Sequence, residues 1–278
     1  MQSNVLRIFP TPHEEVPLKG LYLDEDILTE NEKLDRPFVY GNFITSLDGR
    51  IAVPNPKAGR LTVPEQIAND RDWRLFQELA AQADILITSG RYLRNYIEGT
   101  SQEILQAFDD SKYADLLGWR KEHGMAALPD LAVISGSLDF PVPDPKSWED
   151  RAIVICTSSQ ANSDRIRMVE NEIGEVFIAG EESVRGDLMI EGLAQRGYRS
   201  IYNTTGPKVL HLLLADDVVD RLYLTFAHRV LGGDPFLSIV DGTLLEKPVD
   251  FRLRSAYLDA HALDGAGQLI TSYERLRA

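Results

Sequence analysis

The sequence predicts an α/β fold of three layers, in which helices cover both faces of a mixed, mainly parallel sheet that closes with a C-terminal hairpin. Short apolar runs of strand length alternate with segments of helical pattern, which is typical of parallel strands buried on both faces. Turns of small residues follow several of these runs. The last two runs have near-alternating character and are joined by Asp264-Gly265-Ala266-Gly267, which indicates an antiparallel pair.

The first half of the chain is expected to begin with an extension. Residues 1–35 carry three prolines and an acidic run, so we expect a surface arm attached to a single domain over residues 36–278. A strand is predicted over 38–45. The string TVPE at residues 62–65 has the form of a capping box with proline in the first turn, and it predicts a helix from there to about residue 82.

The remaining elements follow in regular alternation. Buried strands are predicted at 85–88, 131–134, 153–156 and 176–179, and helical patterns cover 103–122 and 187–196. The block 201–234 then holds a strand, a Gly-Pro turn, an apolar helix, a second strand and a Gly-Gly turn. The terminal hairpin is predicted over 251–258 and 269–276.

The composition excludes several classes of partner. With 29 Lys and Arg against 43 Asp and Glu, the 278-residue chain has a net charge of −14, which disfavours binding to nucleic acid or to an anionic membrane surface. No apolar stretch approaches the roughly 18 residues of a membrane span. The single cysteine, Cys156, rules out an internal disulfide, and the five histidines show no metal-ligand spacing. We expect a cytoplasmic protein without a metal.

Small-residue turns mark the expected ligand site. In open α/β sheets, ligands bind beyond the carboxyl ends of the strands, where glycine and hydroxyl residues permit close approach. Three predicted strands end in such turns, namely TSG at 88–90, SGS at 135–137 and TTG at 204–206. Pro207 then suits the first turn of a helix, whose N-terminus favours a phosphate. These turns favour a nucleotide crevice, although the P-loop and the G-x-G-x-x-G fingerprint are both absent.

Several motifs, in order, resemble the riboflavin-pathway pyrimidine reductases, a family with a dihydrofolate-reductase-like fold. The string TSLDGRIA at 45–52 resembles the family signature S-x-D-G-[KR]-I-A. The further matches are LTVP at 61–64, LAAQADILI at 79–87, SGSLDFP at 135–141, TTGP at 204–207, VVDRL at 218–222 and LGG at 231–233. The resemblance covers the chain from about residue 36 to the C-terminus.

This resemblance implies an NADPH-dependent homodimeric reductase, in which hydride passes from the nicotinamide to C1′ of an opened ribosylamine. It implies that Ser46, Asp48 and Gly49 lie near the nicotinamide and a small-molecule substrate. Asp48 is our candidate for orienting substrate or relaying a proton, although an Asp-Gly pair can equally serve as a turn former. The cofactor-binding residues implied are Thr62, Ser89, Gly90, Ser135, Thr205, Gly206, Pro207, Lys208 and Val209.

The substrate half departs from the family pattern. The substrate-phosphate arginine of the family's L-R-A segment is Ala80 here, and the glutamate of its E-G-G turn is Thr204. Arg91 or Arg94 is a candidate replacement for the lost arginine, or else a solvated helix charge. Asn42 matches an asparagine of some members. Two alternatives therefore stay open: a reductase of the same fold acting on a different, non-phosphorylated substrate, and a non-catalytic nucleotide-binding protein.

Overall fold

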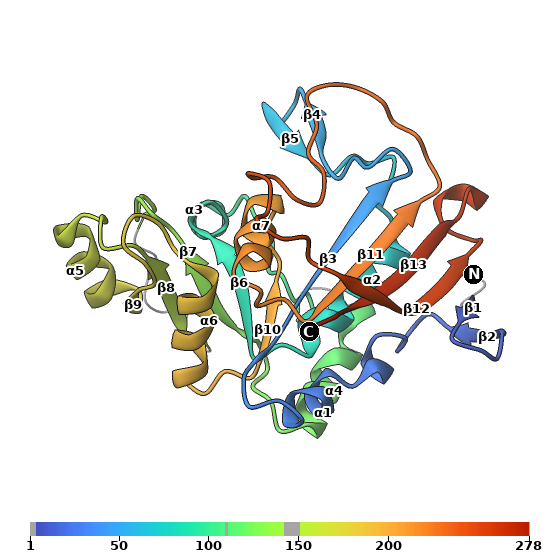
Figure 1. Cartoon of the computed structure of the whole chain (residues 1–278), viewed down its shortest axis with the longest axis horizontal. Helices are drawn as coiled ribbons and strands as arrows, with labels where there is room; N and C mark the ends of the chain where they lie inside the picture. The colour runs from blue at the N-terminus through green and yellow to red at the C-terminus, as the bar shows by residue number, and fades with distance from the viewer. Residues whose placement is uncertain (1–3, 109–110, 142–150, 278) are drawn as a thin grey trace. The chain divides into compact units, whose positions relative to one another are not determined.

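The computed structural model describes residues 4–108, 111–141 and 151–277 (Figure 1). The chain divides into two compact units. Unit 1 comprises residues 1–26, 40–76 and 206–278, and unit 2 comprises residues 27–39 and 77–205. Two elements, β3 (Phe38–Ser46) and α2 (Asp70–Ala81), extend across these limits and are described with unit 1, which holds most of each.

Unit 1 is built on a mixed array of strands. Their order is β2 (Glu14–Pro17), β1 (Asn4–Phe9), β12 (Phe251–Asp259), β13 (Gln268–Arg275), β11 (Arg221–Ala227) and β3. β11 and β3 run parallel, with Arg221 opposite Tyr40 and Ala227 opposite Ser46, whereas the other pairs are antiparallel. Figure 1 shows β3, β11, β13 and β12 side by side. The unit also holds α7 (Pro207–Ala215) and a small hairpin of β4 (Val53–Asn55) and β5 (Arg60–Thr62).

Unit 2 is a parallel array. Its strands lie in the order β10 (Ser200–Asn203), β6 (Ile85–Ser89), β7 (Asp130–Ile134), β8 (Ile153–Thr157) and β9 (Glu175–Ile178). Its helices are α1 (Ile27–Glu32), α3 (Gly90–Ile97), α4 (Asp115–Glu122), α5 (Ser163–Glu172) and α6 (Gly186–Gln195). Close packing of α6 on β9 depends on Gly192, because a Cβ there would lie 2.1 Å from the Phe177 ring.

The predicted fold class is confirmed. Parallel pairing predominates, the C-terminal hairpin is present as β12 and β13, and helices lie on both sides of the sheet (Figure 1). The runs near residues 85, 131 and 153 form largely buried strands, because helices cover parallel strands on both faces. The prediction of a buried strand at 176–179 was wrong in burial, because β9 is the last strand of the array and Ile178 is 44% exposed. Among the residues described, no helix is both long and apolar enough to cross a membrane.

Two helix predictions were wrong in extent. Thr62 ends strand β5 instead of capping a helix, and α2 begins at Asp70. The cap is Asn69, whose Oδ1 accepts from the backbone N–H groups of Arg71 at 3.1 Å and Asp72 at 3.0 Å. The helix expected over 103–122 is reduced to α4, because the amide of Gln77 bonds the backbone at residues 104 and 106 and fixes an irregular segment there.

The N-terminal residues differ from the predicted surface arm. β1 pairs with β12, so the segment extends the sheet of unit 1. Beyond it, Tyr22 is almost fully buried, and its ring lies 4.6 Å from that of Tyr223 on β11. The polar and proline-rich composition of this segment concealed its strands, because β1 and the edge strand β2 bury only part of their side chains. The sequence interpretation also missed α3 and α5.

Candidate active site

The turn after β3 is organised by the side chains of Ser46 and Asp48. The Ser46 hydroxyl accepts from the Arg50 backbone N–H at 3.0 Å and donates to Asp48 Oδ1 at 2.5 Å. Gly49 has a φ of +81°, a left-handed conformation that glycine adopts without strain. The S-L-D-G string therefore encodes a tight turn at the carboxyl end of the strand, with Ser46 itself buried.

Asp48 also joins this turn to the Gly-Gly turn after β11. Its carboxylate accepts from the backbone N–H groups of Gly232 at 2.8 Å and Leu231 at 3.2 Å, and from the Arg50 guanidinium at 2.8 Å. These donors, with the Ser46 hydroxyl as the largest contribution, hold the pKa of the Asp48 carboxyl well below its usual range. Asp48 is therefore ionised at neutral pH and committed to several donors. This geometry favours the turn-forming role over the proton relay.

Arg50 strengthens the same junction. Its guanidinium donates to the Gly233 carbonyl from Nε at 3.3 Å and from Nη2 at 3.1 Å, and it lies 4.3 Å from the centre of the Phe236 ring. The backbone N–H of Leu47 donates to the Arg229 carbonyl at 2.8 Å. The two turns of unit 1 thus form one cross-linked rim at the carboxyl ends of β3 and β11.

In unit 2, the carboxyl ends of β6 and β7 bring together three of the predicted residues. Ser89 caps α3 by accepting from the Tyr92 backbone N–H at 3.3 Å. A Cβ at Gly90 would lie 2.9 Å from the Ser135 hydroxyl, so only glycine permits this approach. The Ser135 hydroxyl in turn accepts from the Leu138 backbone N–H at 3.1 Å. Ser89, Gly90 and Ser135 are therefore neighbours, as the sequence led us to expect.

The turn after β10 lies against β6. The Thr204 hydroxyl donates to the Ile87 carbonyl at 2.9 Å, and the Asn203 side-chain oxygen accepts from both the backbone N–H and the hydroxyl of Thr205. The Thr205 hydroxyl is thus used inside the turn, and the Thr204 hydroxyl is used by β6. What the turn offers a ligand is its backbone and the opposite end of the Asn203 amide.

Three buried polar atoms at the carboxyl ends of unit 2 strands have no hydrogen-bond partner among the described residues. They are the hydroxyls of Thr88 on β6 and Thr157 on β8, and the amide nitrogen of Asn203 on β10. Buried polar groups are normally paired, and an orphaned group carries a free-energy cost of about 1–3 kcal/mol. A polar ligand at this edge could pair with these atoms. A nucleotide cofactor carries the hydrogen-bond donors and acceptors that such pairing needs.

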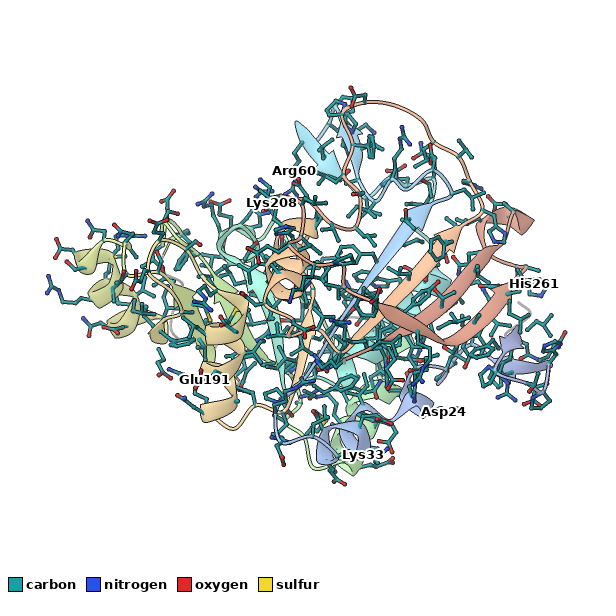
Figure 2. All side chains as sticks on the ribbon, in the orientation of Figure 1. Asp24, Lys33, Arg60, Glu191, Lys208 and His261 are labelled. Atoms are coloured by element: carbon teal, nitrogen blue, oxygen red, sulfur yellow. The ribbon has the colours of Figure 1, made fainter. Side chains whose placement is uncertain are left out.

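The N-terminus of α7, in unit 1, is open to a ligand. Pro207 occupies the first turn, no side chain caps the helix, and the space beside Gly206 is empty. Figure 2 shows Lys208 at this end of the helix, where its charge adds to the positive end of the helix dipole. Val209 follows in the same turn. These features fit the predicted pyrophosphate position.

Three other predicted residues lie elsewhere in their units. The Thr62 hydroxyl accepts from Asn55 at 3.2 Å within the β4–β5 hairpin. Arg94 is bound to Asp139, with its guanidinium 3.3 Å from that carboxylate, and so is committed. Arg91, in the first turn of α3, is exposed.

One buried acid that the sequence interpretation missed lies in unit 1. Asp72, in the first turn of α2, is only 8% exposed and bonds the Thr225 hydroxyl of β11. Its Oδ1 atom has no partner in the described part of the chain. Burial raises the pKa of Asp72 to about 6. No sequence signal distinguishes it, because acids are ordinary in a first helical turn.

Comparison with known proteins identifies the fold family. A family model described as the RibD C-terminal domain matches residues 37–262. The chain belongs to this family. A relative from Archaeoglobus fulgidus, 2,5-diamino-6-ribosylamino-4(3H)-pyrimidinone 5′-phosphate reductase, is 24% identical over 208 residues, which is 74% of this chain and 87% of the relative. The predicted resemblance to riboflavin-pathway reductases is thereby confirmed.

Solved structures agree on the fold. A pyrimidine reductase-like protein from Corynebacterium diphtheriae has a TM-score of 0.70 at 21% identity, with 95% of this chain and 100% of that chain covered. The riboflavin biosynthesis reductase Rib7 of Saccharomyces cerevisiae has a TM-score of 0.51 at 14% identity, with 91% and 98% covered. Both structures therefore share the fold of this chain along most of its length.

Two positions that were expected to bind the substrate lack the groups that the resemblance implies. Ala80 is fully buried in α2, so this position presents no phosphate-binding group. The Thr204 hydroxyl is turned back to Ile87, so it does not substitute for the acid expected there. Membership of the RibD family therefore fixes the fold and the type of cofactor, a nicotinamide nucleotide, more firmly than it fixes the substrate.

Proposed function

We propose that this chain is an NADPH-dependent reductase that acts on a ribosylaminopyrimidine of the riboflavin pathway. The observation that carries the proposal is the family match over residues 37–262. The similarity to the Archaeoglobus fulgidus reductase supports it. When bound, the reduced nicotinamide supplies hydride to C1′ of the opened ribosylamine. The protein holds the two reacting carbon atoms together and excludes water, which contributes to the acceleration.

The residues at the strand ends fit the cofactor. The orphaned hydroxyls of Thr88 and Thr157 and the amide nitrogen of Asn203 offer hydrogen bonds to a nucleotide. The uncapped N-terminus of α7, with Lys208, would hold the pyrophosphate. In the first turn of α3, Arg91 would pair with the 2′-phosphate that distinguishes NADPH from NADH.

A second candidate differs only in the substrate. Ala80 and Thr204 leave two of the family's phosphate- and substrate-binding positions without their usual groups, which favours a non-phosphorylated ribosylaminopyrimidine. The loss of one bidentate arginine contact costs a few kcal/mol, or roughly a hundredfold in affinity. A non-phosphorylated substrate would not incur that loss.

One assay separates these candidates. NADPH oxidation is followed by absorbance with the phosphorylated ribosylaminopyrimidine and with the same compound after removal of its phosphate. Faster turnover of the phosphorylated compound supports the first proposal, and the reverse ratio supports the second. Tight NADPH binding without oxidation by either compound would contradict both and would identify a non-catalytic nucleotide-binding protein.

We also propose a homodimer, which would form through one face of the unit 1 sheet. Opposite residues on neighbouring strands form an apolar row of Leu6, Leu258, Leu269 and Phe226. All four are at least partly exposed, on the face opposite Thr225 and α2. A row of this kind on a single face is typical of an association surface. The cytoplasmic location remains a prediction from the sequence.

A further inference from the structure

Asp72 is a buried acid whose burial has no structural explanation. The N-terminus of α2 is already capped by Asn69, so the Asp72 carboxylate is not needed there. Its one identified side-chain bond is to the Thr225 hydroxyl, while Oδ1 has no partner among the described residues. A carboxyl group that is 92% buried and half satisfied opposes folding, and such groups concentrate at functional sites.

The strand register places this acid beside the predicted active-site turn. Thr225 pairs with Ile44 on β3, and the next pair on the same face is Ala227 with Ser46. Two residues along a strand span about 7 Å, so the Thr225–Asp72 pair lies one step below Ser46. Asn42 and Ile44, on this same face of β3, are only half-buried. Part of this face of β3, next to Thr225, is therefore accessible to solvent.

The groups around Asp72 leave it free to carry a proton. Arg71, its neighbour on α2, is paired with Asp259 at 2.7 Å. From the N-terminal segment, Tyr22 interacts electrostatically with Asp72 and with Glu25. Burial is the main cause that raises the pKa of the Tyr22 phenol, and both carboxyl groups raise it further. From β11, Thr225 offers only a hydroxyl. No cation contributes to the titration of Asp72, whose main influence is burial.

From this geometry we propose that Asp72, positioned by Thr225, is the catalytic acid that protonates the substrate of the reductase. The proposal rests on the function proposed above. Hydride from the reduced nicotinamide adds to C1′ of the C=N bond, and the π electron pair passes to nitrogen. That nitrogen takes the proton of the Asp72 carboxyl, which becomes a carboxylate and recovers a proton from solvent. The nicotinamide is oxidised by two electrons and the C=N bond is reduced to an amine.

The test compares D72N with D70N. Asp70 lies in the same turn of α2 but is exposed, so it is a matched control. Single-turnover hydride transfer is measured from pH 5 to pH 9 with NADPH and the phosphorylated or non-phosphorylated pyrimidine. In the wild type the rate should fall tenfold per pH unit above about pH 6. D72N should be slower by roughly 10²–10⁴-fold and lack this slope.

Two further measurements keep the inference separate from folding and from substrate identity. NADPH affinity, measured by fluorescence quenching, should stay within about twofold in D72N because Asp72 faces the substrate. T225V removes a donor to the carboxylate, so the descending limb should move to higher pH. A D72N enzyme with the wild-type rate and slope would overturn the proposal.

If no pyrimidine is reduced, the proposed function fails, and a direct titration then decides the inference. Protein labelled with ¹³C at the aspartate carboxyl groups is titrated by NMR with and without the free triaminopyrimidinone base of the proposed substrate. The resonance that D72N removes should titrate near pH 6 and shift when the base is added. If the chemical shift of this resonance does not change when the base is added, Asp72 lies outside the substrate site.

Discussion

Replacing Asp72 with asparagine should stabilise the protein at alkaline pH, although it removes a side chain that we propose is catalytic. The pKa of this carboxyl rises from 3.8 to about 6 on folding because the group is buried. The folded state therefore binds the proton more tightly than the unfolded state. Its contribution to stability is present below pH 3.8 and is lost as the pH rises through about 6.

The magnitude follows from the size of the shift. About two pKa units at 1.36 kcal/mol each correspond to roughly 3 kcal/mol of folding free energy at pH 8. Asparagine fills the same space without a charge, so D72N should be more stable than the wild type at pH 8 by up to about 3 kcal/mol. The difference should shrink by about 0.8 kcal/mol at pH 5.5, where part of the wild-type carboxyl is protonated.

Urea unfolding followed by tryptophan fluorescence measures this difference at pH 5.5 and pH 8. Comparing variants at each pH cancels every other titrating group, and both values avoid the isoelectric point near 4.8, where solubility is lowest. D70N is the control, since Asp70 is exposed and its replacement should give a difference that does not change with pH. A D72N protein that is less stable than the wild type at pH 8 would refute the argument, as would a difference that is equal at both pH values.

Three further predictions address the rest of the site. D48N should lower kcat/KM by about 100-fold because the turn loosens, but the pH profile above pH 5 should remain that of the wild type. Steady-state kinetics across that range measure both quantities, and a changed slope would contradict the prediction. R91A should raise KM for NADPH by about tenfold and leave KM for NADH unchanged. R167A, on the exposed face of α5, is the control. Equal effects of R91A on both cofactors would exclude a contact with the 2′-phosphate. L258D should convert the dimer to monomers, as measured by sedimentation equilibrium. L188D changes a partly exposed leucine outside the apolar row and should leave the dimer intact. A wild-type protein that is monomeric would contradict the proposed interface.

The sequence was most informative where one local pattern decides the structure. Buried parallel strands are continuously apolar, so the strands near residues 85 and 153 could be placed to within one residue. Gly90 and Ser135 could be assigned to one sheet edge because strand ends in a parallel array meet there. Their close packing then explains why a glycine stands after β6.

The sequence was least informative where competing local signals had to be resolved by tertiary contacts. Both Thr62 and Asn69 have the chemistry of a helix cap, and only the pairing of β4 with β5 decides against Thr62. The burial of Tyr22 depends on its contact with Tyr223, a residue far along the chain. Asp72 shows the same limit most clearly, because its burial and its bond to Thr225 involve a strand that is distant in the sequence.

Asp48 and Asp72 illustrate how the environment assigns different tasks to the same side chain. Asp48 lies within the family signature, and its several donors hold its pKa low, so it is suited to fixing the turn and unsuited to carrying a proton. Asp72 lies outside any motif, and with little besides Thr225 to compensate for its burial, its pKa moves towards neutrality. If hydride transfer requires an acid, substitutions at Asp72 and Thr225 must therefore change the pH dependence of the reaction. Substitutions at Asp48 must leave this pH dependence unchanged, provided that the turn after β3 stays in place.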